Sequence, residues 1–266
     1  MKKKMALFLI LSMCMLGTAT VHATESADGS QTENQSDSQD AGTENQKSGW
    51  QVEDGGWYYY ADGQRATGWL YLPDGTYYLD ESTGAMQTGW GWINGQWYYF
   101  SQSGAMQIGW VLDNHSWYFM QNDGSMYKGW LDQDGTWYYM NGSGVMQTGW
   151  LYQNHAWYYL LGNGAMYTGW LWDRDQWYFM YSDGSMATGM ITVGNADYYQ
   201  APSGETLYGW IWKGDAWCYA DADGVIQKNM WKWIDGECYY FDSTGNMAVD
   251  TWIDGCEVNS SGAWVY

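Results

Sequence analysis

A tryptophan returns along most of this chain at a nearly constant interval, and this period constrains the fold more than any other feature. The successive intervals are 19 and 21 residues, then 20 residues six times, then 21 residues twice. A fixed period of this size indicates a stack of small units that contact their neighbours rather than one central core. We call these positions the lead positions: Trp50, Trp69, Trp90, Trp110, Trp130, Trp150, Trp170, Met190, Trp210, Trp231 and Trp252.

Other residues recur in register with the lead positions. Seven residues after most of them stands a second tryptophan: Trp57, Trp97, Trp117, Trp137, Trp157, Trp177 and Trp217. In the second repeat we assign this place to Tyr77, which follows Trp69 by eight residues. A glycine comes later in each regular repeat, and two residues beyond it there is usually a methionine: Met86, Met106, Met126, Met146, Met166, Met186 and Met247.

Each repeat is predicted to be a β-hairpin. Aromatic runs such as residues 137–140 favour strands, and turn pairs such as Asp134-Gly135 lie between the lead and the second tryptophan. Such a pair between two aromatic runs is the strongest short-range hairpin signal. One hairpin alone is marginally stable in water, so its neighbours must supply the missing burial. We therefore expect an all-β fold, a β-solenoid of about ten to eleven stacked hairpins with a 20-residue repeat.

Side chains alternate between the two faces of a strand. Trp137 and Tyr139 therefore share one face of their strand, while Tyr138 and Met140 share the other. One face can pack against the next hairpin while the other stays available, and the pattern does not distinguish the two.

The chain before the first lead position has a different composition. Residues 1–23 resemble a secretory signal peptide: three lysines, an apolar run too short to span a bilayer, and a cleavage motif ending at Ala23. Residues 24–48 are polar and acidic without an aromatic side chain, which predicts a disordered linker. The repeats fill residues 49–266, where no further apolar run predicts a transmembrane segment in the mature chain.

Composition and charge restrict the partners. Aromatic residues make up 20% of the chain, as 22 Trp and 25 Tyr but only 5 Phe, a bias typical of half-exposed and ligand-facing positions. The net charge is −20, and removal of the three N-terminal lysines leaves 7 basic and 30 acidic residues, or −23. Phosphate repulsion then argues against nucleic acid and against an anionic lipid surface, whereas a cation is favoured.

The recurring aromatic residues suggest a cage for such a cation. The lead tryptophan, the second tryptophan and the next lead tryptophan can wall a cavity at each junction, with the intervening methionine as a soft, adaptable wall. A quaternary ammonium group suits this box because it has no N–H to donate. Ring faces attract it through their quadrupole, at roughly 0.5–2 kcal/mol per contact.

The repeat resembles the choline-binding repeats of Gram-positive surface proteins. Gly89-Trp90, Trp97-Tyr98-Tyr99, Gly104-Ala105-Met106 and Gly109-Trp110 match that pattern position by position, and the likeness extends over residues 49–266. It implies a solenoid that holds the choline or phosphocholine of wall (lipo)teichoic acids and tethers a protein to the cell surface without a cofactor. It implies these cages: Trp90, Trp97 and Trp110; Trp110, Trp117 and Trp130; Trp130, Trp137 and Trp150; Trp150, Trp157 and Trp170, with Met106, Met126, Met146 and Met166 beside them and Trp177 as a further candidate. A tyrosine such as Tyr118 or Tyr138 is an alternative wall.

Two other functions, glucan binding and catalysis, are alternatives to choline binding. A further alternative assigns no function to the tryptophans and interprets them as the packed core of the solenoid. Sugar rings also stack on aromatic side chains, so a glucan-binding surface adhesin is the nearest alternative. An enzyme is not expected, because acids such as Asp132 and Asp134 occupy turns, where local hydrogen bonding explains them. His115 and His155 lie in equivalent turns, and neither they nor the acids have the spacing of a metal site.

The last repeats depart from the pattern. Met190 and Asp197 stand where the eighth repeat needs two tryptophans, Cys238 takes the second place in the tenth, and Asn259 takes it in the last. We therefore expect no cage in the eighth repeat and a cap at the C-terminal end. Cys218 is interpreted as a small buried substitute for an aromatic residue, and Cys238 with Cys256 as a candidate disulfide.

Overall fold

The structure is a computed structural model that describes residues 46–265. The predicted signal peptide and almost all of the predicted linker lie outside these residues. Within them every regular element is a β-strand, which confirms the all-β prediction. The described part of the chain has no helix long and apolar enough to cross a membrane.

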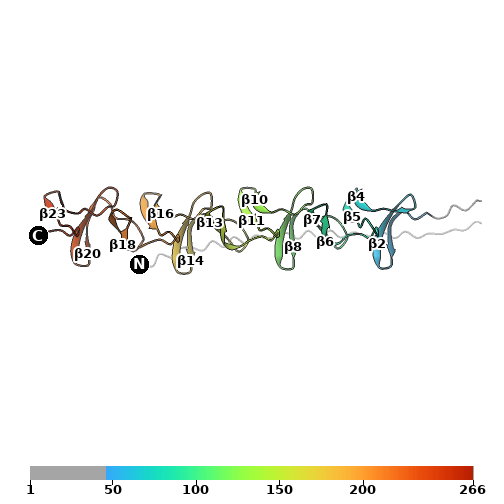
Figure 1. Ribbon diagram of the computed structural model, residues 1–266, viewed down its shortest axis with the longest axis horizontal. Coiled ribbons are helices and arrows are strands. Elements are labelled where there is room, and N and C mark those ends of the chain that lie inside the picture. The colour runs from blue at the N-terminus through green and yellow to red at the C-terminus, as the bar shows by residue number, and fades with distance from the viewer. Residues whose placement is uncertain (1–45, 266) are drawn as a thin grey trace, which may run out of the picture. The chain divides into compact units, whose positions relative to one another are not determined.

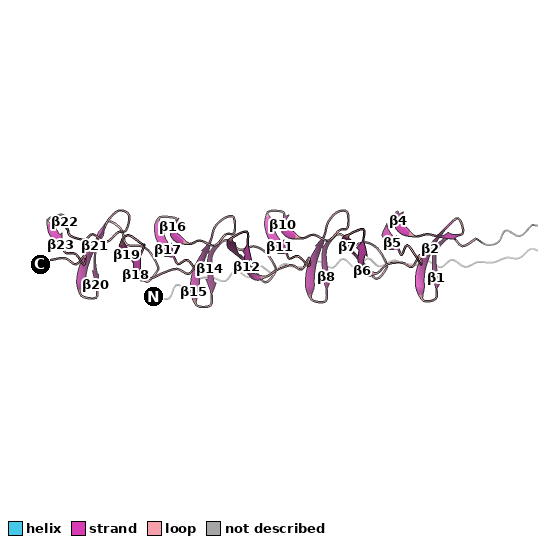
Figure 2. Cartoon of the chain, in the orientation of Figure 1, coloured by secondary structure: helices cyan, strands magenta, loops and turns pink. Residues whose placement is uncertain are grey.

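The strands form one three-stranded and ten two-stranded sheets within residues 46–265, each built on one antiparallel hairpin. Successive hairpins follow one another in chain order (Figures 1 and 2). The first nine strands are β1 (Gly49–Glu53), β2 (Gly56–Ala61), β3 (Gln64–Arg65), β4 (Gly68–Leu72), β5 (Gly75–Leu79), β6 (Gly89–Ile93), β7 (Gln96–Phe100), β8 (Gly109–Asp113) and β9 (Ser116–Met120). They are followed by β10 (Gly129–Gln133), β11 (Thr136–Met140), β12 (Gly149–Gln153), β13 (Ala156–Leu160), β14 (Gly169–Asp173), β15 (Gln176–Met180), β16 (Gly189–Val193) and β17 (Ala196–Gln200). The last six are β18 (Gly209–Trp212), β19 (Trp217–Ala220), β20 (Met230–Ile234), β21 (Glu237–Phe241), β22 (Thr251–Ile253) and β23 (Cys256–Val258).

In most hairpins the turn between the two strands has positive φ at both central residues. In the fifth hairpin Asp134 has φ 53° and Gly135 has φ 80°. Two-residue turns of this mirror-image type match the right-handed twist of the flanking strands, and they favour Asn or Asp followed by Gly. The sequence signal for hairpins thus reflects the backbone that the turns adopt.

Each hairpin has a forward face and a backward face. Register pairs Trp130 with Tyr139 and Asp132 with Trp137, so both tryptophans and Tyr139 lie on the face toward the following hairpin. The intervening residues Tyr138 and Met140 point the other way, toward the preceding hairpin. The structure thus shows which strand face meets the preceding hairpin and which meets the following one, a choice that the sequence pattern left open.

The core is a row of buried side chains, which we call the core file, with one residue from each hairpin. From the second hairpin onward, the last residue of the second strand is at most 1% exposed: Leu79, Phe100, Met120, Met140, Leu160, Met180, Gln200, Ala220, Phe241 and Val258. None of these residues is a lead or a second tryptophan. The second tryptophans of the regular repeats remain 37–48% exposed. Burial of the stack therefore does not explain why they recur.

Backbone hydrogen bonds join each hairpin to the next. The Met166 N–H donates to the Trp137 carbonyl oxygen at 2.8 Å, and the same bond recurs from Met146 to Trp117. The methionine of one loop also lies against the glycine of the next loop. A Cβ at Gly144, where φ is +79°, would stand 2.3 Å from the Met126 Sδ atom. Glycine is required there both by its backbone conformation and by close packing.

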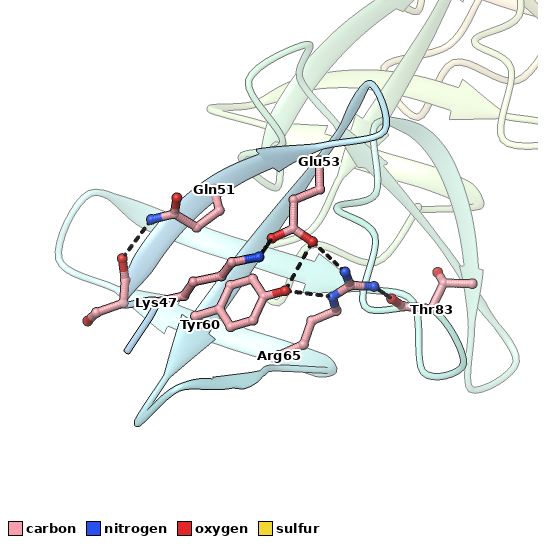
Figure 3. Close-up of polar contacts among 7 residues, drawn as sticks. Lys47, Gln51, Glu53, Tyr60, Arg65 and Thr83 are labelled. Carbon is pink, nitrogen blue, oxygen red and sulfur yellow. Dashed lines mark hydrogen bonds and ion pairs between the residues drawn. The ribbon is translucent and has the colours of Figure 1, made fainter. Parts of the chain in front are cut away.

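Charged side chains tie the first hairpin to the loop of the second (Figure 3). Glu53 accepts from Lys47 and from the Arg65 Nη2 atom, each at 2.6 Å. Arg65 also donates to the Tyr60 hydroxyl at 3.3 Å and to the Thr83 carbonyl oxygen at 3.1 Å. Because exposed ion pairs contribute little free energy, this cluster adds little to the stability of the array.

Two details of the repeat alignment differ from the prediction. In the second hairpin Tyr71 pairs with Thr76, so Thr76 occupies the place of the second tryptophan. Tyr77, assigned to that place from the sequence, instead lies on the backward face, 7% exposed and 4.9 Å from the Trp50 ring. The interval from Trp69 to the second position is therefore the regular one, and the turn itself differs: its central residues, Pro73 and Asp74, lack the positive φ of the regular turns.

The C-terminal hairpin is shorter than the others. Its strands β22 and β23 have 3 residues each, and Trp252 is 65% exposed. Trp264 takes the place of the loop methionine, since its N–H donates to the Cys238 carbonyl oxygen. The Trp264 ring lies 6.4 Å from that of Trp231. The end of the array therefore departs from the repeat geometry, as expected of a cap.

Candidate functional site: aromatic cages between hairpins

A cavity of about 240 Å³ opens between the third and fourth hairpins. Its walls are Trp90 and Trp97 from the third hairpin, Tyr118 and Met126 from the fourth repeat, and Ser143 from the loop of the fifth. The Trp90 and Trp97 rings are perpendicular, with an interplanar angle of 89° and centroids 6.2 Å apart. The Tyr118 ring stands 4.6 Å from Trp90. Three aromatic faces and a thioether thus surround one open cavity.

The same arrangement recurs along the array. Cavities of about 430, 370 and 330 Å³ have the following principal walls: Trp130, Trp137, Tyr158 and Met166; Trp150, Trp157, Tyr178 and Met186; Trp210, Trp217, Tyr239 and Met247. Equivalent ring contacts join further triplets, namely Trp50, Trp57 and Tyr77; Trp110, Trp117 and Tyr138; Trp170, Trp177 and Tyr198. Below, each cage takes the name of its lead tryptophan.

The structure regroups the predicted site residues. The third ring of the Trp90 cage is Tyr118 and not the next lead tryptophan, Trp110. Trp110 lies on the forward face of its own hairpin and therefore walls the following cage, with Trp117 and Tyr138. The alternation of side chains along a strand explains this, because the tyrosine after each second tryptophan points backward. Two rings from one hairpin and one from its neighbour were expected, and this division holds.

The methionines are displaced by one repeat from their predicted cages. Met126 lines the Trp90 cage, where Met106 was expected, and Met166 lines the Trp130 cage, where Met146 was expected. Met106 instead donates its N–H to the Thr76 carbonyl oxygen, at the junction that lacks a second tryptophan. The Trp170 junction has Thr206 in the methionine position, bonded to the Trp177 carbonyl oxygen. The loop folds back across the preceding hairpin, which linear spacing does not reveal.

Family models match most of the repeats. A model described as choline-binding repeat matches residues 47–88 and 87–128, and a second model of that description matches residues 225–264. A model for a cell wall binding repeat matches residues 128–146, 148–166 and 168–186. None of the curated proteins searched matches the chain.

Solved structures with the same fold include CbpJ from Streptococcus pneumoniae TIGR4. It is 30% identical over 82% of this chain and 100% of its own, with a TM-score of 0.59. The chain belongs to the choline-binding repeat family. Choline binding protein F from Streptococcus pneumoniae is 28% identical over 83% of this chain and 100% of its own, with a TM-score of 0.55. The choline-binding domain of CbpL from the same species is 31% identical over 68% and 98%, with a TM-score of 0.52.

Acidic side chains accompany several cages of these choline-binding repeats. The Trp90 indole N–H donates to Asp113 Oδ2 at 3.1 Å, and the Trp150 indole N–H donates to Asp173 Oδ2 at 2.8 Å. Asp183 lines the Trp130 cage. Hydrogen bonds from the Ser185 hydroxyl and N–H lower the pKa of Asp183, so this carboxylate is charged at neutral pH. These groups make the cage surroundings attractive to a cation.

One junction of the choline-binding repeats carries an ion pair in place of a cage. Asp197 occupies the position of the second tryptophan in the eighth repeat, and it accepts from Lys228 at 2.5 Å and from Thr192 at 2.7 Å. The hydrogen bond from Lys228 lowers the pKa of Asp197, so this carboxylate is charged at neutral pH. Cys218 is fully buried where a cage tyrosine would lie. The prediction that this repeat has no cage agrees with this packing.

The histidines, acids and cysteines were the other candidate groups in the sequence. Within residues 46–265 no cluster of three or more His, Cys, Asp or Glu side chains could hold a metal ion. Cys218, Cys238 and Cys256 are free thiols in the structure, so the predicted Cys238–Cys256 bridge is absent from it. Burial raises the pKa of the Cys218 and Cys238 thiols, which makes them poor nucleophiles.

Proposed function

We propose that this protein is a secreted, non-catalytic cell-wall-binding module that holds choline of wall teichoic or lipoteichoic acids in its aromatic cages. The observation that carries the proposal is the recurrence of one cage geometry, two perpendicular tryptophans and a tyrosine from the next hairpin, at successive junctions. The predicted signal peptide, residues 1–23, and linker, residues 24–48, are part of the same proposal.

The chemistry of the cage suits a quaternary ammonium group. Its walls are ring faces and a methionine thioether, which attract a cation by its charge and not by hydrogen bonds. Each ring contact contributes about 0.5–2 kcal/mol, so a single cage gives modest affinity. Cages along one chain raise the effective concentration for a polymer that carries many cholines, and avidity then exceeds single-site affinity by ~10²–10⁴.

The acids of the turns and loops support a role without catalysis. Asp132 Oδ1 accepts the Gly135 N–H at 2.8 Å, and Asp221 Oδ1 accepts the N–H groups of Asp223 and Val225. These carboxylates shape the backbone around them. A glycosidase would instead direct two carboxyl groups across a substrate cleft.

The test is intrinsic tryptophan fluorescence of the full chain titrated with choline, with a glucan oligomer and ethanolamine in parallel. Choline should change the emission at millimolar concentration. Ethanolamine should bind about 10-fold more weakly, because the ring walls replace most of the water that its N–H groups hydrogen-bond in solution. A response to the glucan without a response to choline would overturn the proposal and favour a glucan-binding adhesin.

A further inference from the structure

The Trp130 and Trp150 cages differ in the charge at one equivalent rim position. The first residue of the turn in the following hairpin lines each cage, and it is Asn154 in the Trp130 cage and Arg174 in the Trp150 cage. An equivalent loop residue that lines each cage differs as well. Asp183 lines the Trp130 cage, whereas Ser203 lines the Trp150 cage. The two cages have the same kind of aromatic walls, but a carboxylate lines the Trp130 cage and a guanidinium lines the Trp150 cage.

Arg174 occupies a backbone conformation that disfavours arginine. Its φ is 48°, and Asp175 follows with φ 62°. In seven other hairpins this turn position holds Asp or Asn, which tolerate left-handed φ: Asp54, Asn94, Asn114, Asp134, Asn154, Asp235 and Asp254. A side chain that costs backbone energy where its equivalents do not is a candidate for a functional role.

The Arg174 guanidinium is available to a ligand. Its side chain is 86% exposed, and its contact with Asp173 is a loose one, 3.8 Å from Nε to Oδ2. Asp173 also accepts the indole N–H of Trp150, so the carboxylate is engaged from two sides. A guanidinium at the rim repels a bare cation in the cage. It attracts an anion attached to that cation, because planar guanidinium groups bind phosphate with two parallel hydrogen bonds.

We propose that Arg174 makes the Trp150 cage selective for a phosphorylated choline over free choline. The quaternary ammonium group enters the ring walls and the adjoining phosphate contacts Arg174. The neighbouring Trp130 cage, with Asn154 and Asp183 on its rim, prefers the unphosphorylated cation. This inference rests on the proposed choline-binding function and assigns different ligand preferences to cages of one chain.

The cage methionines provide a separate signal for each site. The full chain labelled with [¹³C-methyl]methionine is titrated by NMR with choline, phosphocholine and inorganic phosphate. Met186 reports on the Trp150 cage and Met166 on the Trp130 cage, with assignments from Met186→Leu and Met166→Leu. Phosphocholine should bind the Trp150 cage about three- to tenfold more tightly than choline, the range expected of an exposed charge-assisted contact. The order should reverse at the Trp130 cage.

The variants Arg174→Asn and Asn154→Arg exchange the rim groups. Arg174→Asn should abolish the phosphocholine preference at Met186, leave the Met166 response unchanged and raise thermal stability, because Asn tolerates the turn conformation. Asn154→Arg should create a phosphocholine preference at Met166. Inorganic phosphate alone should shift neither signal.

The outcomes separate this inference from the proposed function. If neither ligand moves any cage methionine in the wild-type protein, the proposed function itself fails. If both ligands bind but Arg174→Asn keeps the wild-type preference, only the role of Arg174 is overturned. A shift of Met186 by inorganic phosphate as large as that by phosphocholine would also overturn it, since the cage would then contribute nothing.

Discussion

The second tryptophan and the last residue of the same strand show how one residue position serves binding while another serves the fold. Trp137 is 41% exposed and lies on the forward face, whereas Met140 is 1% exposed and belongs to the core file. They are three residues apart and therefore point to opposite faces. The exposed ring is available to a ligand because the core does not depend on it. Thr76 shows that a small residue is compatible with the hairpin at this position.

Replacing Trp137 with Thr should remove the Trp130 cage without unfolding the hairpin. Loss of one ring wall should weaken choline binding there by about 0.5–2 kcal/mol, or roughly two- to thirtyfold. The Met166 methyl signal under choline titration measures this effect. Met140→Ala is the matched contrast, and it should reduce the free energy of unfolding by about 2–5 kcal/mol because it leaves a cavity. A Trp137→Thr protein as unstable as Met140→Ala would show that the tryptophan is core.

At the scale of the element, each repeat is a hairpin followed by a loop. The methionine of this loop lines the cage formed by the tryptophans of the preceding hairpin. The loop methionine donates its N–H to the second tryptophan of the hairpin before, and its side chain is held under the glycine of the loop after. The Trp90 cage therefore depends on three consecutive repeats. A backbone change in one loop should therefore alter ligand binding in a cage whose tryptophans lie two repeats earlier in the chain.

Gly144→Ala should impair the Trp90 cage specifically. Its Cβ would lie 2.3 Å from Met126 Sδ, so the methionine wall must move. Gly149→Ala is the control, since Gly149 has a similar φ of +75° but no atom within 4 Å of an added Cβ. Both variants should lose about 1–2 kcal/mol of stability from the left-handed backbone. Only Gly144→Ala should change the Met126 methyl signal and weaken choline binding at Trp90, and equal effects on binding would refute the packing role.

The Asp197–Lys228 pair should make the eighth junction sensitive to acid. Because Lys228 lowers the folded-state pKa of Asp197, the pair's contribution is present above the unfolded pKa of about 3.9 and is lost as pH falls through the folded value. Wild type and Lys228→Met are compared by thermal unfolding from pH 7 to pH 2. Their stability difference should shrink as the pH falls below about 4. A difference independent of pH would mean that Lys228 acts through packing alone.

At the scale of the whole molecule, the proposed function depends on several cages of modest affinity and on the negative net charge of the chain. Cages of similar geometry recur from Trp50 to Trp210, interrupted at the second and eighth junctions. The acidic residues surround these cages with negative potential, which attracts cholines but opposes the phosphates that carry them. A zwitterionic polymer is held best when several cages engage it together.

Binding to a choline-coated surface should exceed binding to free choline by ~10²–10⁴ in affinity. Removing one cage with Trp137→Thr should lower the surface affinity by several-fold only, because the other cages keep the chain attached. Surface plasmon resonance on choline-coated and uncoated chips measures both quantities. Equal affinity for free and surface-bound choline would show that a single cage is active.

The period, the turn pairs and the aromatic runs were sufficient to predict hairpins, their order and the tryptophans that recur in them, because these features are local. The ring that completes each cage, the methionine that lines it and the place of Thr76 were decided only by tertiary structure. The physical reason is that a period of 20 residues reveals which positions are equivalent but not how far each loop reaches over its neighbour. Side-chain alternation identifies Tyr118 as opposite to Trp117 on its strand, yet only the stack shows that this backward face meets Trp90. The sequence likewise shows Arg174 only as a turn residue, and the stacking of hairpins brings it to the cavity lined by Trp150 and Trp157.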